Sequence, residues 1–245
     1  MENEEIVTLS FFSFEGLSNK LWAFGQMGFA HRHMANLPGV RFYKLFGSGS
    51  GESFTPWPNF GVYAIMAVWP SLEEAKQQTS SAAIYRRYQN HSTEHGTVYL
   101  SAYQVRGEWD GNVPFIENKS LKGTKAPEPI GVLTRATIRK RALLSFWRRA
   151  PAISEATTHE GDLLLKRGIG EIPWLHQVTF SIWSNRAAMV RFAHQGGCHA
   201  LAAKAAFDKG WFSESLFARF AVVDTKGTWE GKSLETLVSR MGERV

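Results

Sequence analysis

Hydrophobic and polar positions change period along the chain in an order that predicts its secondary structure. Runs with two-residue alternation or unbroken apolar character indicate strands, and stretches with apolar residues three or four positions apart indicate helices. In the first half the pattern predicts strand, helix, strand, strand, helix and strand, over residues 6–14, 17–36, 40–46, 61–69, 71–91 and 97–105. The second helix opens with Ser71-Leu72-Glu73-Glu74, the pattern of a capping box.

The second half repeats this order. Its elements are predicted over residues 131–138, 142–153, 163–166, 177–183, 186–208 and 216–223. Short motifs repeat as well: a Gly-x-Trp-acid-Gly pattern at 107–111 returns at 227–231, and Trp22 is matched by Trp147. One duplicated unit with loop insertions explains both observations.

The β-α-β-β-α-β order is that of a ferredoxin-like unit, whose sheet has an apolar face that needs covering. Two such units in one chain cover each other most simply. We therefore expect an α+β fold in which two tandem ferredoxin-like halves form an intrachain dimeric α/β barrel. Residues 1–117 are assigned to the first half, 118–129, rich in Lys, Gly and Pro, to a linker, and 130–245 to the second half.

Composition excludes several classes of protein. Of 245 residues, 44% are hydrophobic and 20% charged, so the chain has enough apolar material for a core. Its apolar runs are shorter than the roughly 20 residues of a membrane span, and the acidic residues after Met1 are unlike a signal peptide. The single cysteine, Cys198, excludes a disulfide framework and a cysteine-based zinc site. We expect a cytoplasmic protein.

The net charge of +6 favours an anionic partner. Residues 129–149 contain Arg135, Arg139, Lys140, Arg141, Arg148 and Arg149 and no acidic residue. Two interpretations remain open: peripheral contact with an anionic membrane at its inner face, or an ordinary solvated helix surface. The chain has no nucleic-acid-binding motif, and no nucleic-acid partner is expected.

Common catalytic signatures, such as the P-loop, the Rossmann fingerprint and the serine-hydrolase elbow, are missing. The glycine-rich segment 47–51 is either a flexible turn or a loop that folds over a pocket. The eight histidines do not cluster as a multi-histidine metal site would. His199, in Gly197-Cys198-His199-Ala200, precedes a helix of small residues, so it either caps that helix or binds the iron of a haem.

Several motifs in order resemble one known family. They are Leu9-Ser10-Phe11-Phe12, Leu21-Trp22-Ala23-Phe24-Gly25-Gln26-Met27, residues 44–56, Leu133-Thr134-Arg135-Ala136-Thr137, Gly168-Ile169-Gly170-Glu171-Ile172-Pro173-Trp174, residues 177–183 and Ala218-Arg219-Phe220. From about Val7 to Gly231 the chain resembles the spheroidene monooxygenases of carotenoid biosynthesis. The resemblance implies a haem b oxygenase that acts at C2 of acyclic carotenoids with dioxygen and a donor such as ferredoxin, giving a ketone by two hydroxylations.

The resemblance also implies site residues. The family's Gly-Pro-His-Ala corresponds to residues 197–200, with Cys198 in place of proline, which makes His199 the candidate iron ligand. Other candidates come from placement along the chain and not from the resemblance. Cations at strand ends are candidate propionate partners, namely Lys44, Arg135, Lys166 and Arg219, and Gln177 or His176 is the candidate catalytic group beside bound oxygen. The candidate substrate-pocket residues are Gly49, Gly51, Phe54, Trp57 and Trp174.

Two alternatives remain. One is a haem enzyme of the same barrel type that acts on another apolar small molecule, by oxidation or by dehydration of an aldoxime. The other is a non-catalytic carrier that holds an apolar ligand between the two halves.

Overall fold

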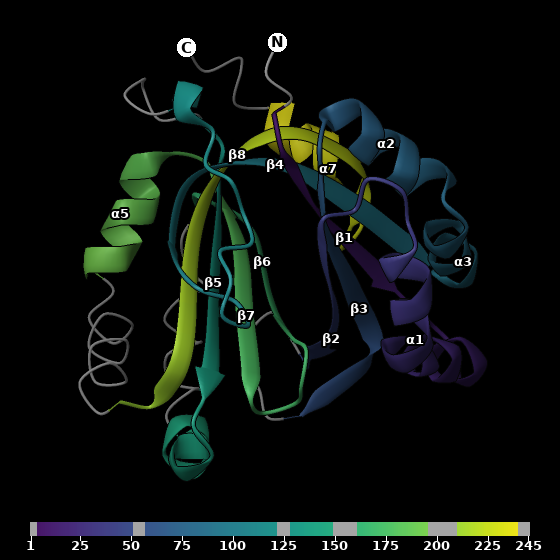
Figure 1. Cartoon of the computed structure of the whole chain (residues 1–245), viewed down its shortest axis with the longest axis horizontal. Coiled ribbons are helices and arrows are strands. Elements are labelled where there is room, and N and C mark those ends of the chain that lie inside the picture. The colour runs from purple at the N-terminus through teal and green to yellow at the C-terminus, as the bar shows by residue number, and fades with distance from the viewer. Residues whose placement is uncertain (1–3, 51–56, 122–127, 149–160, 196–209, 240–245) are drawn as a thin grey trace.

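The computed structural model describes residues 4–50, 57–121, 128–148, 161–195 and 210–239. Within them, eight strands form one antiparallel barrel, and the short β9 (Lys232–Ser233) pairs with the end of β8 (Figure 1). The barrel strands are β1 (Ile6–Ser13), β2 (Phe42–Gly49), β3 (Pro58–Trp69), β4 (Glu94–Gly107), β5 (Ile130–Ile138), β6 (Leu163–Gly170), β7 (His176–Trp183) and β8 (Phe212–Trp229).

Each half contributes four strands in the ferredoxin-like order, β4-β1-β3-β2 and β8-β5-β7-β6. The halves join edge to edge at two seams. One is long, because β4 pairs with β8 from Gly96 to Gly107. The other is short, because β2 and β6 pair only at Gly47 with Gly170 and at Ser48 with Ile169. The predicted α+β barrel of two tandem ferredoxin-like halves is confirmed.

The helices lie outside the barrel (Figure 1). They are α1 (Leu17–Ala35), α2 (Leu72–Ser81), α3 (Ala83–His91), α5 (Arg186–Gln195) and α7 (Leu234–Ser239), with the short η1 (Lys119–Leu121) and η2 (Lys140–Ala142). Helices α1 to α3 cover the first half, α5 lies beside the second, and residues 143–148 form a further helical segment after η2. None of the helices in the described ranges has the length and apolar character of a membrane span.

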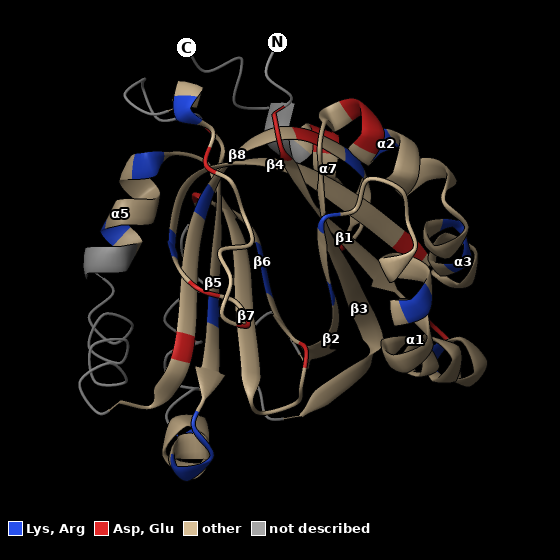
Figure 2. Cartoon of the chain, viewed as in Figure 1, with Lys and Arg blue, Asp and Glu red and all other residues tan. Residues whose placement is uncertain are grey.

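One predicted helix is wrong. Residues 71–91 form two helices, because Ala82 has an extended backbone with φ −62° and ψ 138°. The predicted cap is confirmed: the Ser71 hydroxyl accepts a hydrogen bond from the Glu74 backbone N–H at 3.2 Å, and the first turn of α2 is acidic (Figure 2). The helices predicted over 142–153 and 186–208, and the linker 118–129, lie partly outside the described residues.

Alternation along the strands divides the core between the inside of the barrel and its outer layers. Leu9 and Phe11 of β1 point into the barrel, whereas Phe12 points out toward the helices. Apolar side chains from all eight strands fill the inside, so the barrel is packed and is not a pore. A second large cluster lies under α1 to α3, and a smaller one lies beside α5.

The repeated motif at 107–111 is a tight turn that ties the first half to the second. Gly107 (φ 90°), Asp110 (φ 53°) and Gly111 (φ 72°) have left-handed backbones, which explains the glycines. The backbone N–H groups of Asp110 and Gly111 donate to the carboxylate of Glu214 on β8, at 3.1 and 2.8 Å.

The motif at 227–231 makes the reciprocal contact. The backbone N–H groups of Glu230 and Gly231 donate to the carboxylate of Glu94 on β4, at 2.9 and 2.8 Å. Each half therefore holds a turn of the other through one glutamate, and the sequence repeat follows from this geometry.

Candidate active site

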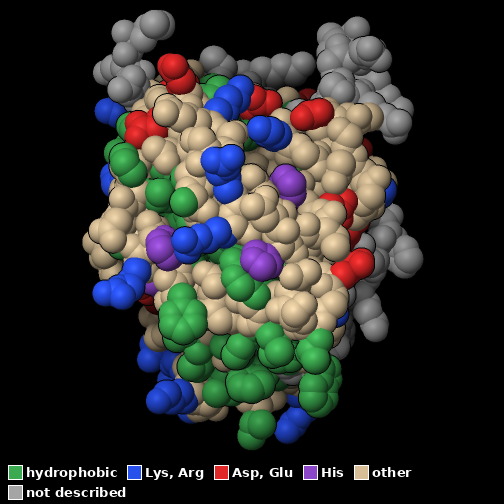
Figure 3. Space-filling view, turned by 90° about the vertical axis from the view of Figure 1, so that its right-hand side faces the viewer, with side chains coloured by type: hydrophobic (Ala, Val, Ile, Leu, Met, Phe, Trp, Pro, Cys, Tyr) green, Lys and Arg blue, Asp and Glu red, His purple; other side chains and the backbone are tan. Residues whose placement is uncertain are grey.

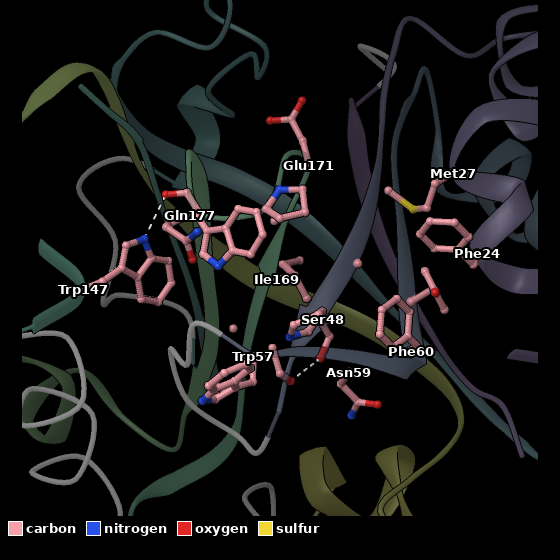
Figure 4. A pocket seen from close by; sticks show the side chains of 18 residues that line it. Phe24, Met27, Ser48, Trp57, Asn59, Phe60, Trp147, Ile169, Glu171 and Gln177 are labelled. Atoms are coloured by element: carbon pink, nitrogen blue, oxygen red, sulfur yellow. Dashed lines mark hydrogen bonds between the residues drawn. The ribbon is translucent and has the colours of Figure 1, made fainter. Parts of the chain in front are cut away.

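A cavity of about 370 Å³ lies on the outside of the barrel over the short β2–β6 seam, where the two halves meet (Figure 4). Its walls come from α1, the start of β3, the turn between β6 and β7, and residues 143–148. The site therefore exists only when both halves are in place.

Glycines form the base of this cavity, so no side chains project into it there. Gly47 and Gly49 of β2 line it, and so do Gly168 and Gly170 of β6. A Cβ atom added to Gly170 would lie 2.5 Å from the carbonyl oxygen of His176, so a larger residue would push the backbone apart there. The missing side chains leave room for a ligand directly over the seam.

Aromatic side chains form the walls. On the first-half side, Phe24 of α1 packs edge to face against Phe60 with ring centroids 5.8 Å apart. On the second-half side, Trp147 donates from Nε1 to the carbonyl oxygen of Trp174 at 3.2 Å (Figure 4). Trp57 stands at the mouth and is 74% exposed. Such a lining suits an apolar ligand.

Gln177 and His176, neighbours in the sequence, lie on opposite faces of β7. Because successive side chains of a strand alternate, Gln177 lines the cavity while His176 faces the inside of the barrel with Val178. His176 approaches Glu171, with Nδ1 and Oε1 3.6 Å apart. Of the two candidate catalytic groups, only Gln177 lies at the cavity.

Glu171 connects the cavity to an ionic cluster inside one end of the barrel. It lines the cavity, accepts a hydrogen bond from Trp109 Nε1 at 2.9 Å and pairs with Lys44 Nζ at 2.8 Å. Lys44 also pairs with Asp110. The base of the cavity is therefore fixed by charged groups that lie behind it.

Arg135 is at the centre of this cluster, with a side chain 1% exposed. It pairs with Glu214, approaches Asp110 at 3.3 Å, and stacks over Trp109 at 5.4 Å from the ring centroid. Carboxylates of the chain itself therefore neutralise Arg135 and Lys44. The cluster holds the 107–111 turn in the end of the barrel.

The pKa values of the cluster follow from burial and charge together. Burial alone would lower the pKa of Lys44, but hydrogen bonds to Asp110 and Glu171 raise it above its ordinary value. Burial would raise the pKa of Asp110, but the Lys44 hydrogen bond and the charges of Lys44 and Arg135 lower it. Burial lowers the pKa of His176 although Glu171 opposes the shift, which favours the neutral imidazole.

Lys166 and Arg219 lie on a different surface, the outer face of the second-half sheet. Arg219 of β8 alternates with Ala218 and Phe220, which point into the barrel. Its guanidinium donates to Gln104 Oε1 at 3.0 Å. The four cations predicted to bind propionates are thus divided, with Lys44 and Arg135 inside the barrel and Lys166 and Arg219 outside it.

The outer face of the first-half sheet is a complete core. Phe12, Leu45, Tyr63, Ile65 and Tyr99 are all buried in the cluster under α1 to α3. In the strand register, Phe12 lies opposite Tyr63, and Leu45 lies opposite Ile65. This is the ordinary way in which a ferredoxin-like sheet is covered by its helices.

The second-half sheet has small and polar residues at the same register positions. Ala136 lies opposite Gln177, and Gly168 lies opposite Thr179, as their counterparts do in the first half. Arg219 takes the position of Tyr99. Ala136, Gln177, Thr179 and Arg219 are half-buried, whereas their counterparts are buried. In the described residues, the apolar core on this outer face is the smaller cluster of Ile130, Val132 and Trp183 beside α5, and the rest of the face adjoins the cavity at Gly168 and Gln177.

Comparison with known proteins places this geometry in a family. A protein of Cereibacter sphaeroides named spheroidene monooxygenase is 42% identical over 242 residues, which cover 98% of this chain and 74% of the relative. The chain belongs to the spheroidene monooxygenase family. A spheroidene monooxygenase of Rhodobacter capsulatus is 41% identical over 239 residues, 98% of each chain. This family member is therefore a monooxygenase, an oxidoreductase.

Solved structures support the fold of the spheroidene monooxygenase family member. An aldoxime dehydratase in complex with butyraldoxime has a TM-score of 0.61 at 10% identity, over 91% of this chain and 81% of that one. At this identity the likeness shows the barrel fold alone. The chain matches no protein-family model.

Some of the predicted site residues lie together at the cavity of this spheroidene monooxygenase family member, and others lie apart from it. Gly49, Trp57, Trp174 and Gln177 line one cavity. His199, Gly51 and Phe54 lie outside the described residues.

Sequence reasoning missed most of the cavity lining, including the aromatic residues Phe24, Phe60 and Trp147. The match of Trp147 with Trp22 in the repeat marks a conspicuous aromatic residue in the second half. Nothing in the sequence shows that Trp147 faces Phe24 across the seam, because the two residues belong to different halves.

Proposed function

We propose that the chain is a haem-dependent monooxygenase that acts at C2 of an acyclic carotenoid and leaves a ketone there. The observation that carries the proposal is that, in the described residues, Ala136, Gly168, Gln177, Thr179 and Arg219 of the second-half sheet stand on its outer face at positions where the first half has a buried apolar core. Relatives named spheroidene monooxygenase, at 42% and 41% identity, support a carotenoid substrate.

The residues of this face fit a large, flat cofactor. Ala136 and Gly168 have a small side chain or none at the positions that Phe12 and Leu45 fill in the first half. Arg219 supplies a cation, and its buried Nε has no hydrogen-bond partner among the described residues. A guanidinium is a suitable partner for a haem propionate, and Lys166 on the same face is a second candidate.

The iron ligand that we propose is His199, which rests on the resemblance of residues 197–200 to the family motif. A haem needs only one protein ligand on its iron. Within the described ranges, no three His, Cys, Asp or Glu side chains gather as a metal site. When bound, the haem would supply oxygen activation, with electrons from a reduced partner such as ferredoxin.

The residues of the cavity would position the substrate. A volume of about 370 Å³ is near the lower end of the range for ligand pockets, roughly 300–1,000 Å³, and accommodates one end of a long polyene. C2 lies near the end of an acyclic carotenoid, so a cavity that holds only one end of the polyene is large enough for the reacting carbon. Gln177 stands where the cavity meets the outer face and would provide a hydrogen-bonding group beside the reacting carbon. Two hydroxylations at that carbon give a gem-diol, and loss of water leaves the ketone.

The proposal is tested by the absorption spectrum of the purified protein, reduced with and without carbon monoxide. We expect a Soret band that His199→Ala abolishes or strongly shifts, while His194→Ala, five residues away, leaves it unchanged. A protein without haem after expression with ample haem supply contradicts the proposal. An unchanged spectrum in His199→Ala contradicts the assignment of the ligand.

The substrate is tested separately by chromatography of the products formed from an acyclic carotenoid under dioxygen. We expect a ketone product, and we expect Trp174→Ala to lower turnover while the Soret band remains. Conversion of a smaller apolar substrate but of no carotenoid contradicts the substrate assignment and leaves the haem assignment intact.

A further inference from the structure

Helix α1 is apolar on two faces. Ala23, Ala30 and Met34 are buried against the sheet. Leu17, Leu21 and Phe24 are spaced four and three residues apart, which places them on one stripe of the helix, and all three are exposed. A helix that only covers a sheet needs one apolar face. The outer stripe therefore requires another explanation.

The stripe continues around the mouth of the cavity. Figure 3 shows hydrophobic side chains gathered at one end of the molecule. Exposed apolar residues either line the cavity or lie beside its lining residues, on the same stripe of α1, on segment 143–148 or on the turn between β6 and β7. We call this set the apolar rim: Leu17, Leu21, Phe24, Trp57, Phe60, Leu144, Ile172 and Trp174. Among them, Leu144 is 81% exposed. Phe24, Trp57, Phe60 and Trp174 also line the cavity, so the rim and the cavity form one continuous apolar surface.

Basic residues border the apolar rim. Arg139, Lys140, Arg141 and Arg148 are exposed on the segment that carries Leu144 and Trp147, seen in blue below β5 in Figure 2. No acidic residue occurs between 130 and 148. Glu15, just before α1, is an exposed acid near the other side of the rim. Cations around an apolar patch match anionic lipid headgroups above an acyl layer.

We infer that the apolar rim docks on an anionic lipid bilayer, so that the cavity opens into the bilayer. This docking would place the exposed Trp57 and Trp174 between headgroups and acyl chains, where tryptophan is favoured in membranes. A second copy of the chain fits less well, because two copies meeting through the rim would bring their basic segments together without counter-charges. The inference of docking depends only on the apolar rim and the basic residues beside it. Only the entry of a polyene from the bilayer into the cavity rests on the proposed function.

The test is co-sedimentation of the purified protein with two kinds of vesicle, phosphatidylcholine alone and phosphatidylcholine with one quarter phosphatidylglycerol, without substrate. We expect binding to the anionic vesicles that weakens as salt is raised. Leu21→Ser with Phe24→Ser should weaken this binding at least about tenfold, since two large apolar side chains no longer enter the bilayer.

The matched control is Phe29→Ser. Phe29 is also exposed on α1, at 72% against 56% for Phe24, but does not line the cavity, and helical geometry places it about 140° around the helix from Phe24. We expect it to bind vesicles like the wild type. Near-equal binding to both vesicles, equal losses in the rim and control variants, or a dimer in light scattering that the rim variant dissociates each overturns the inference. The Soret band of the rim variant is recorded in parallel, so failure of docking is distinguished from failure of haem binding.

Discussion

The two glutamates that hold the turns allow a matched measurement of the ionic cluster. Glu214 and Glu94 each accept hydrogen bonds from two backbone N–H groups of the opposite half. Glu214 also pairs with Arg135, whose side chain is 1% exposed. Replacing each glutamate with glutamine removes the charge and keeps the size, so the pair of variants isolates the contribution of Arg135.

The magnitude follows from these contacts. In both variants an amide oxygen keeps one backbone hydrogen bond, and the loss of the other, charge-assisted bond costs about 1–2 kcal/mol. Glu214→Gln also removes an anion from the buried Arg135. Breaking a buried ion pair costs roughly 3–5 kcal/mol, reduced here to about 2–3 kcal/mol because Asp110 and Glu171 stay near the guanidinium, at 3.3 and 4.0 Å.

We therefore expect Glu214→Gln to lower the free energy of unfolding by about 4 kcal/mol and Glu94→Gln by about 1.5 kcal/mol. For a chain of this size the first value corresponds to a Tm lower by about 8–16 °C. Guanidinium unfolding followed by circular dichroism at pH 7.5 measures both variants. If the two variants lose the same unfolding free energy, within about 0.5 kcal/mol, the ion pair between Arg135 and Glu214 does not stabilise the fold and the reasoning is refuted.

The remaining predictions concern the turn and the histidine. Gly107→Ala should destabilise the protein by several kcal/mol, because its Cβ would lie 2.1 Å from the Ser215 carbonyl oxygen. Gly111→Ala, also at positive φ but with open space around it, should cost only about 1 kcal/mol. Similar losses of unfolding free energy for the two variants in denaturant would contradict the clash. The folded-state pKa of His176 is lowered, so the unfolded chain binds more protons and stability falls as the pH falls from about 6.5 toward that pKa. His176→Gln should flatten the fall between pH 7 and 5, and an unchanged slope would contradict a lowered pKa of the half-buried His176.

Much of the fold is determined by local pattern. The two periods of hydrophobic positions predict the strands, and the repeat of 107–111 at 227–231 predicts two related halves, because residues near in sequence share one element and one register. The break at Ala82 was not predicted, because alanine favours a helix and only packing on the sheet divides α2 from α3. The length of β4 and β8 was also missed, because they extend by pairing with each other across a seam.

The site shows the same division. The sequence by itself determined the family, through motifs in order, and it singled out Trp57, Trp174 and Gln177. Only the tertiary structure decided that these line one cavity with Phe24, and that Lys44 and Arg135 serve carboxylates inside the barrel. The physical reason is that a strand's side chains alternate between two faces, and a seam joins residues more than a hundred positions apart. Which face is inside, and what lies across the seam, is set by closure of the barrel.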